Sequence, residues 1–140
     1  MKDHAAILLR DRQMVLFVQR AATKKKLPNI WAVPSGTIEE GESPEQTVLR
    51  EALEELGIAV RIEWPLATVE LPELGARLHF IVCTASSDAP ISCDASEIQA
   101  YEWNTFEGFL DEHPDEEIGH GLVYLRRHPE LWRGMFAVAH

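Results

Sequence analysis

The sequence predicts an α+β fold with a mixed β-sheet. Strand segments precede and follow one strongly signalled helix in the chain, and more helices are expected at the end. Two observations support this prediction. Short apolar or alternating runs, typical of strands, recur between residues 5 and 103, and one segment between them, residues 43–56, has clear helix start and stop signals. With 140 residues the chain is long enough for a real core. We therefore expect a single domain over residues 1–140.

The strands are predicted from apolar runs that are bounded by turn residues. They are expected at residues 5–10, 14–20, 31–34, 58–63, 66–71, 76–84 and 98–103. Residues 76–84 are apolar enough for a central strand. Pro65 is expected to break the sheet between residues 58–63 and 66–71.

The helix over residues 43–56 is predicted from its two ends. Ser43 is a natural N-cap, Pro44 suits the first helical position, and Gln46 completes a capping box. Gly57 follows the last turn, where a left-handed residue commonly ends a helix. Three further helices are expected at residues 105–110, 114–127 and 129–137, the second being weakened by two glycines.

The two faces of the helix over residues 43–56 differ in character. One apolar stripe is expected from Leu49, Ala52, Leu53 and Leu56. The other face carries Glu51, Glu54 and Glu55, whose mutual repulsion amounts to about 0.2–0.5 kcal/mol per pair. A divalent cation is the simplest physical reason for concentrating these carboxylates, because Mg²⁺ and Mn²⁺ prefer hard oxygen ligands. An ordinary solvated acidic face is the alternative.

The composition excludes several classes of function. The net charge of −10 argues against non-specific binding to nucleic acid or to anionic membranes. The apolar run at residues 5–9 is too short for a signal peptide or a membrane span. Of the two cysteines, Cys83 lies in an apolar run and is expected to be a buried thiol. A reducing, cytoplasmic location is therefore expected.

An ordered motif extends from Gly36 to Ile58. Gly36 is followed by five residues and Glu42, and seven more lead to the run Arg50-Glu51-Ala52-Leu53-Glu54-Glu55-Leu56-Gly57-Ile58. This pattern resembles the Nudix box, G-x5-E-x7-R-E-U-x-E-E-x-G-U, at every fixed position. The preceding residues 31–36 are similar to the family's W-x-x-P-G-G lead-in, with Ser35 where glycine is usual. The resemblance implies the Nudix α/β/α sandwich.

The resemblance also implies a chemistry. Nudix enzymes use a divalent cation to hydrolyse a pyrophosphate link in a nucleoside diphosphate that is joined to another group. The expected ligands of Mg²⁺ or Mn²⁺ are Glu51, Glu54, Glu55 and the carbonyl group of Gly36. Glu54 and Glu51 are the expected catalytic acids, and Arg50 orients them. Glu97, outside the box, is a second candidate for the general base, with an ordinary solvated acid as its alternative.

Substrate contacts are predicted from three residues, each with a simpler alternative. Arg20 is expected to reach a phosphate, or else to be a surface arginine. Trp31 and Phe80 are expected to stack on a base, or else to belong to the core. The expected partner is a small-molecule nucleotide, without stable nucleic acid or membrane contact, and the chain is expected to be a monomer or homodimer.

The substrate itself stays open at this point. A (deoxy)nucleoside triphosphate, oxidised ones included, suits the short chain. Pro72 lies at a spacing past the box that resembles ADP-ribose-cleaving members, although a turn explains a proline equally well. The resemblance also extends to nucleotide-sensing modules without catalysis and to isoprenoid diphosphate isomerases, although an isomerase needs a catalytic cysteine in a different local setting.

Overall fold

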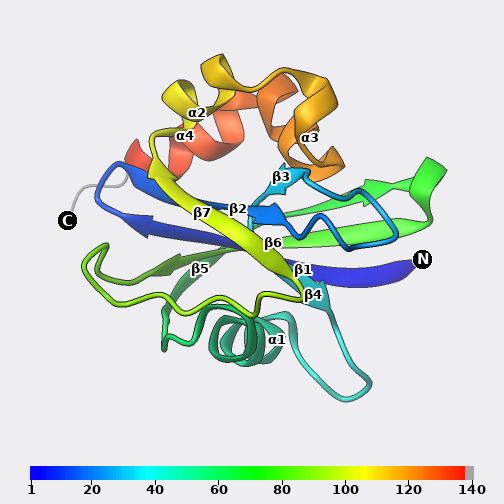
Figure 1. Cartoon of the computed structure of the whole chain (residues 1–140). Helices are drawn as coiled ribbons and strands as arrows, with labels where there is room; N and C mark the ends of the chain where they lie inside the picture. The colour runs from blue at the N-terminus through cyan, green and yellow to red at the C-terminus, as the bar shows by residue number, and fades with distance from the viewer. Residues whose placement is uncertain (138–140) are drawn as a thin grey trace.

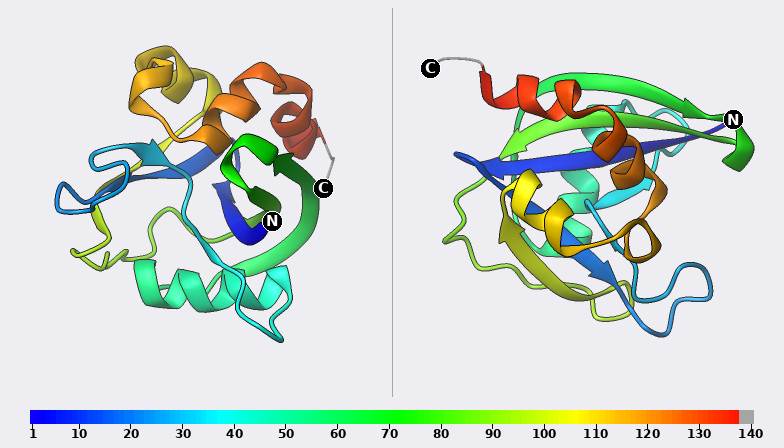
Figure 2. Two further views of the ribbon diagram at one scale, coloured as in Figure 1. Left: turned by 90° about the vertical axis from the view of Figure 1, so that its right-hand side faces the viewer. Right: turned by 90° about the horizontal axis from the view of Figure 1, so that it is seen from above.

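A mixed β-sheet lies between one helix on one face and three helices on the other (Figure 1). The computed structural model describes residues 1–137, so the last three residues of the predicted domain lie outside the described part. The helices are α1 (Pro44–Glu51), α2 (Phe106–Glu112), α3 (His120–Arg127) and α4 (Pro129–Ala137). Figure 2 shows α2, α3 and α4 lying across the face opposite α1. This arrangement confirms the predicted α/β/α sandwich.

The sheet contains seven strands in the order β3-β2-β1-β6-β5, with β4 paired to β1 and β7 paired to β2. Their bounds are β1 (Lys2–Asp11), β2 (Met14–Arg20), β3 (Trp31–Ala32), β4 (Ser35–Thr37), β5 (Arg61–Leu71), β6 (Ala76–Thr84) and β7 (Ile98–Asn104). β1 and β6 run parallel and the other pairs are antiparallel. The sheet is therefore mixed, and β6 is an inner strand as predicted.

Side chains alternate between two cores along each inner strand. In β1, Ala6 and Leu8 pack toward α2–α4, while Ile7 and Leu9 pack toward α1. All four are 0–3% exposed. This period of two follows from strand geometry, because successive side chains point to opposite faces.

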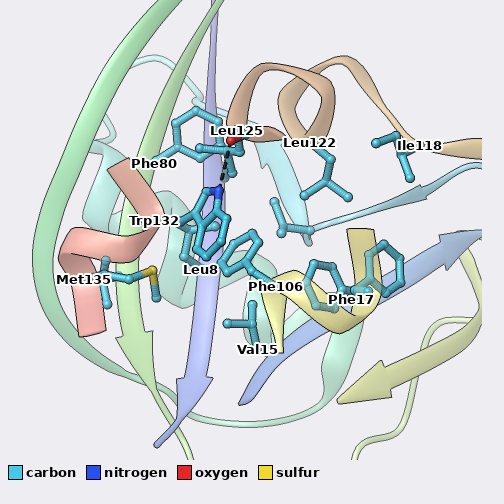
Figure 3. Packing of buried hydrophobic residues seen from close by; sticks show 14 of the residues in the cluster. Leu8, Val15, Phe17, Phe80, Phe106, Ile118, Leu122, Leu125, Trp132 and Met135 are labelled. Atoms are coloured by element: carbon cyan, nitrogen blue, oxygen red, sulfur yellow. Dashed lines mark hydrogen bonds between the residues drawn. The ribbon is translucent and has the colours of Figure 1, made fainter. Parts of the chain in front are cut away.

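The core beneath α2, α3 and α4 is rich in aromatic rings (Figure 3). Phe106 stacks on Trp132 with 5.0 Å between ring centroids, and Phe17 stacks on Phe109 at 3.8 Å. The indole Nε1 of Trp132 donates a 2.9 Å hydrogen bond to the carbonyl oxygen of Leu125. α4 is thus fixed both by apolar packing and by a satisfied polar atom.

Two predicted boundaries are wrong. Residues 61–71 form one strand through Pro65, because β5 is an edge strand and the register shifts on both sides of the proline. The helix expected from residue 114 begins only at His120, since Ile118 is extended and forms an isolated bridge with Trp31. A short 3-10 turn at Asp115–Glu117 occupies the intervening chain.

The predicted ends of the acidic helix are confirmed, but its predicted apolar stripe is only half right: Ala52 and Leu56 are buried, whereas Leu49 and Leu53 are exposed. Ser43 and Gln46 form the capping box, and α1 continues through one π-helical turn, Ala52–Leu56, to Gly57 in the left-handed region. The buried row is Val48, Ala52 and Leu56, together with Thr47 and Glu51. Leu49 and Leu53 are 43% and 58% exposed, because each lies about 100° further round the helix from that row.

Two further points concern the Cys83 thiol and membrane-spanning helices. Cys83 is fully buried with a free thiol, and burial raises its pKa to about 12. Across residues 1–137, no helix combines the length and apolar character that crossing a membrane requires.

Candidate active site

Gly36 and Glu51 approach each other closely where β4 passes over α1. β4 pairs with β1 through Ala5 and Gly36, which places the glycine against the helix. A Cβ atom at Gly36 would lie 2.2 Å from the carboxyl carbon of Glu51 and 2.3 Å from its Oε1. Only glycine leaves room for this carboxylate, whose side chain is 11% exposed.

Arg50 holds the acids of the site from one side. Its Nε and Nη2 donate to Glu42 at 2.7 and 3.0 Å, and Nη2 also donates to the carbonyl oxygen of Thr37 at 3.1 Å. Its Nη1 donates to Glu51 at 2.8 Å and to Glu54 at 3.2 Å. These bonds raise the pKa of Arg50 and, chiefly through the guanidinium, lower the pKa of Glu42 to about 2. Arg50 therefore fixes the positions of three acids in the motif, Glu42, Glu51 and Glu54.

Glu55 lies in the most acidic surroundings of the site. Burial, followed by the neighbouring Glu51 and then by Glu97 and Asp94, raises the pKa of Glu55 to about 8. All of these effects act in the same direction, because a low-polarity environment and nearby carboxylates both disfavour a further negative charge. A set of hard oxygen donors that repel one another fits a divalent cation such as Mg²⁺ or Mn²⁺.

The loop between β6 and β7 brings two of these carboxylates to the helix end. The amides of Ser92 and Asp94 donate to the carbonyl oxygens of Leu56 and Glu55 at 3.0 and 3.1 Å. These bonds satisfy carbonyl groups that a helix end leaves free. Asp94 is thereby placed beside Glu55, and Glu97 follows it in the chain.

A polar cleft of about 520 Å³ contains the motif. It is lined by His4, Arg20, Ser35, Gly36, Thr37, Glu39, Glu51, Glu54, Glu55, Asp94 and Glu97. The lining of the cleft thus includes all the predicted metal and catalytic residues except Arg50. Arg50 does not line the cleft but donates hydrogen bonds to Glu51 and Glu54. A larger open hollow of about 1080 Å³, at the far end of β1, is lined by none of the predicted site residues.

Arg20 lies at the rim of the cleft and is engaged with the following loop. Its Nε donates to the carbonyl oxygens of Lys26 and Leu27, both at 3.2 Å, and its Nη2 donates to Lys26 at 2.9 Å. Lys24 from the same loop forms a 2.7 Å ion pair with Glu97. The loop is therefore attached to the cleft at two points, and a phosphate contact by Arg20 stays a prediction.

A second, mostly apolar pocket of about 230 Å³ adjoins the cleft. The two share His4, Arg20 and Ser35. Phe80 is fully buried and forms part of the inner wall of this pocket. Trp31 lines neither space; it packs edge-on against Phe109, with 5.6 Å between ring centroids. In this structure both aromatic side chains thus have core contacts, and their contact with a base stays untested.

Sequence reasoning missed Asp94 and His4 as residues of the cleft. Asp94 lies in a Ser/Asp/Pro loop that gives no periodic signal, and only its hydrogen bond to Glu55 places it at the site. His4 has no metal-ligand spacing in the sequence, yet it lies where the cleft and the apolar pocket meet. Ser35, where glycine is usual, starts β4 without a positive φ, so serine causes no strain there.

Comparisons with known proteins agree with this geometry. A family model for the NUDIX domain matches residues 2–125. The 8-oxo-dGTP diphosphatase of Proteus vulgaris is 34% identical over 82 residues, which span 57% of this chain and 73% of that protein. An RNA pyrophosphohydrolase of Gluconobacter oxydans is 31% identical over 124 residues, which span 73% of this chain and 70% of that protein. Some relatives are much longer: the match covers 40% of Nudix hydrolase 2 from Arabidopsis thaliana, at 27% identity.

Solved structures have the same fold. A protein from Deinococcus radiodurans superposes with a TM-score of 0.74 at 25% identity, covering 90% of this chain and 82% of that one. The MutT protein of Methanosarcina mazei has the same TM-score at 20% identity, covering 92% and 93% of the two chains. With the complete motif, its assembled acidic cleft and the matching family model, the chain belongs to the Nudix family of hydrolases.

Proposed function

We propose that this chain hydrolyses a pyrophosphate bond in (deoxy)nucleoside triphosphates, oxidised ones included, with Mg²⁺ or Mn²⁺ as cofactor. One observation carries the proposal: a cleft lined by six carboxylate side chains shares three lining residues with an apolar pocket. A nucleoside triphosphate has the same two parts, a polyphosphate chain that needs a cation and a planar base that avoids water.

The dimensions of the two spaces support this assignment. The polar cleft of about 520 Å³ has room for a polyphosphate chain, and the apolar pocket of about 230 Å³ has room for one ring system. In this proposal the sugar and the first phosphate would lie beside the residues that both spaces share, His4, Arg20 and Ser35.

Each acid has a distinct role in the proposal. Glu51, Glu55 and Gly36 would hold the cation, with Glu54 beside them. When bound, a divalent cation neutralises phosphate oxygens and lowers the pKa of a coordinated water. Arg50 keeps Glu51 and Glu54 in place throughout, since it contacts both.

Glu54 is the proposed general base. Its side chain is 59% exposed, and one of its oxygens accepts from Arg50 while the other faces no partner among the described hydrogen bonds. Glu97 is paired to Lys24 at 2.7 Å, which makes it the less available acid of the two. A carboxylate that opens to the cleft can take a proton from an attacking water.

The competing substrates are disfavoured by particular residues. A net charge of −10 opposes the binding of an RNA chain beyond its 5′ end. Pro72 begins the 3-10 turn Pro72–Leu74, and that turn accounts for a proline without any contact to ADP-ribose. Cys83 is fully buried beneath α1, which leaves its thiol without access to an isoprenoid substrate.

A substrate panel tests the proposal. Purified protein with Mg²⁺ or Mn²⁺ is incubated with the four deoxynucleoside triphosphates, 8-oxo-dGTP, ADP-ribose and a 5′-triphosphorylated oligonucleotide, and pyrophosphate, phosphate and nucleoside monophosphates are measured separately. We expect pyrophosphate and a nucleoside monophosphate from the triphosphates. Faster turnover of ADP-ribose or of the oligonucleotide would replace the proposed substrate, and no turnover of any of them would favour a nucleotide-sensing module.

A further inference from the structure

Two exposed leucines from separate parts of the chain line the apolar pocket. Leu27, in the loop between β2 and β3, is 47% exposed, and Leu74, at the end of the 3-10 turn before β6, is 46% exposed. A single exposed leucine is ordinary, but apolar side chains that gather at a pocket commonly mark a binding surface. These two therefore suggest an apolar rim.

The backbone fixes the position of Leu27. Leu27 and Asn29 have φ values of 51° and 64°, in the left-handed region that side-chain-bearing residues seldom adopt. Arg20 binds the carbonyl oxygen of Leu27, and Gln99 donates a 2.8 Å hydrogen bond to the side chain of Asn29. Such strained residues persist only where their surroundings hold them, so the rim is preorganised.

Gly121 keeps the inner wall of the pocket open. A Cβ atom at this position in α3 would lie 3.3 Å from Leu78 and 3.6 Å from the ring of Phe80. Both of those side chains line the same pocket. A larger side chain at this position would therefore press on Leu78 and Phe80 and reduce the space in the pocket.

The pocket is poor in side chains that read the edge of a base. Among the described residues, its polar side chains are those of His4, Arg20, Ser35 and His120. Among the side chains that read base edges through two oriented hydrogen bonds, only that of Arg20 belongs to this described lining, and its guanidinium already donates to the carbonyl oxygens of Lys26 and Leu27. An apolar pocket separates similar substrates by only about 10–200-fold, whereas pockets that hydrogen-bond the distinguishing group reach about 10⁴–10⁵-fold.

We infer that the enzyme selects the base through apolar contact with Leu27 and Leu74 and through the space that Gly121 leaves. We infer also that it accepts several bases with low selectivity. The inference rests on the proposed function, because it names how that site chooses its substrate. It places guanine, its oxidised form and adenine within about 200-fold of one another in kcat/KM.

Substitutions at the rim test the inference by kinetics. In Leu27→Ala and Leu74→Ala, we expect KM for each purine triphosphate to rise about tenfold, from lost apolar contact, while kcat stays within about twofold. Gly121→Val should raise KM further by filling the pocket. Leu49→Ala is the matched control, since Leu49 is 43% exposed and lines neither space. Gly134→Ala is the control for the glycine, because a Cβ there meets nothing within 4 Å.

A binding experiment separates this inference from the proposed function. Deoxynucleoside monophosphates are titrated calorimetrically into metal-free protein, so that neither cation nor turnover is needed. We expect purines to bind more tightly than pyrimidines, with binding weakened about tenfold in Leu27→Ala and Leu74→Ala but not in Leu49→Ala. Three results would overturn the inference. They are absence of purine binding to the wild type, equal binding by all variants, and a preference above about 10³-fold between two purines. If the monophosphates bind as expected but no triphosphate is hydrolysed, the proposed function fails and the pocket assignment stands.

Discussion

The two faces of the sheet differ in the side chains that they gather. The face covered by α2, α3 and α4, here called the aromatic face, buries Phe17, Phe106, Phe109 and Trp132, each at most 3% exposed. The face covered by α1 (Figure 1) has an apolar core as well, but its edge holds the acidic cleft. There, burial and neighbouring carboxylates raise the pKa of Glu55 to about 8.

The contrast lies between the ring stack of the aromatic face and the acidic edge, and the apolar pocket under α3 belongs to the aromatic face as well. Packing among Phe17, Phe106, Phe109 and Trp132 should stabilise the fold with little dependence on pH, because none of these four side chains ionises. The acidic edge opposes folding when its carboxylates are ionised, since each disfavours its neighbour's charge. Substitutions in the acidic cleft and in the ring stack, which does not line the apolar pocket, should therefore separate turnover from stability.

The largest expected effect comes from replacing a single carboxyl group at the acidic edge. In Glu54→Gln and Glu55→Gln, turnover should fall about 10²–10⁴-fold, while urea unfolding changes little, since glutamine has nearly the same size and adds no charge. Steady-state kinetics and urea unfolding measure the two quantities. Glu45→Gln, in the first turn of α1 and outside the cleft, is the control that should keep full turnover. Near-normal activity in both cleft variants would contradict the assignment.

On the aromatic face the pattern should reverse. Phe106→Ala removes a fully buried ring that stacks on Trp132, so the free energy of unfolding should fall by about 3–5 kcal/mol. Turnover per folded molecule should stay unchanged at a temperature where the variant is still folded. Tyr101→Ala is the control, because Tyr101 is 45% exposed. A large loss of turnover in folded Phe106→Ala would mean that the two faces are coupled.

A smaller effect is expected from a residue that acts through the acids. Lysine at position 50 keeps the charge but cannot bind Glu42 through two nitrogens while also holding Glu51 and Glu54. Arg50→Lys should therefore weaken metal affinity about 10–100-fold, as loss of an orienting contact commonly does. A metal titration followed by kinetics measures this, and kcat at saturating metal should recover most of its value. Failure to recover at any metal concentration would indicate a direct catalytic role instead.

The smallest effect concerns pH and stability without metal. The pKa of Glu55 is about 8 in the folded state against an ordinary 4.5, so the folded state holds its proton more tightly. Its contribution to stability is fully present below pH 4.5 and is lost as pH rises toward 8. Thermal unfolding of metal-free protein should show this decline, and Glu55→Gln should flatten it. An equal decline in that variant would show that another group is responsible.

Much of this contrast was predictable from local sequence signals. The spacing from Gly36 to Ile58 identified the acids, and Ser43 with Gln46 identified the start of their helix, because capping depends only on neighbouring residues. The buried row of α1 was not predictable in this way. Leu49 is as apolar as Leu56, and only packing against the sheet determines which of them is buried.

Other features depended on tertiary pairing. Asp94 reaches Glu55 through backbone hydrogen bonds between a loop and a helix end, for which the sequence has no local signal. The continuity of β5 through Pro65 depended on its place at the edge of the sheet, which follows from strand order rather than from composition. The apolar pocket likewise arises from segments far apart in the chain.

Proton release on metal binding tests the central claim most directly. Calorimetric titration of Mg²⁺ or Mn²⁺ into the protein, in two buffers of different ionisation enthalpy, counts the protons displaced. With a pKa of about 8, the Glu55 carboxyl is mostly protonated at pH 7, so metal binding should release about one proton there. The number of protons released should fall toward zero by about pH 9. In Glu55→Gln it should be near zero already at pH 7. Metal binding at pH 7 that is unchanged in Glu55→Gln, or no binding at millimolar metal even with a substrate analogue present, would contradict a cation held among these carboxylates.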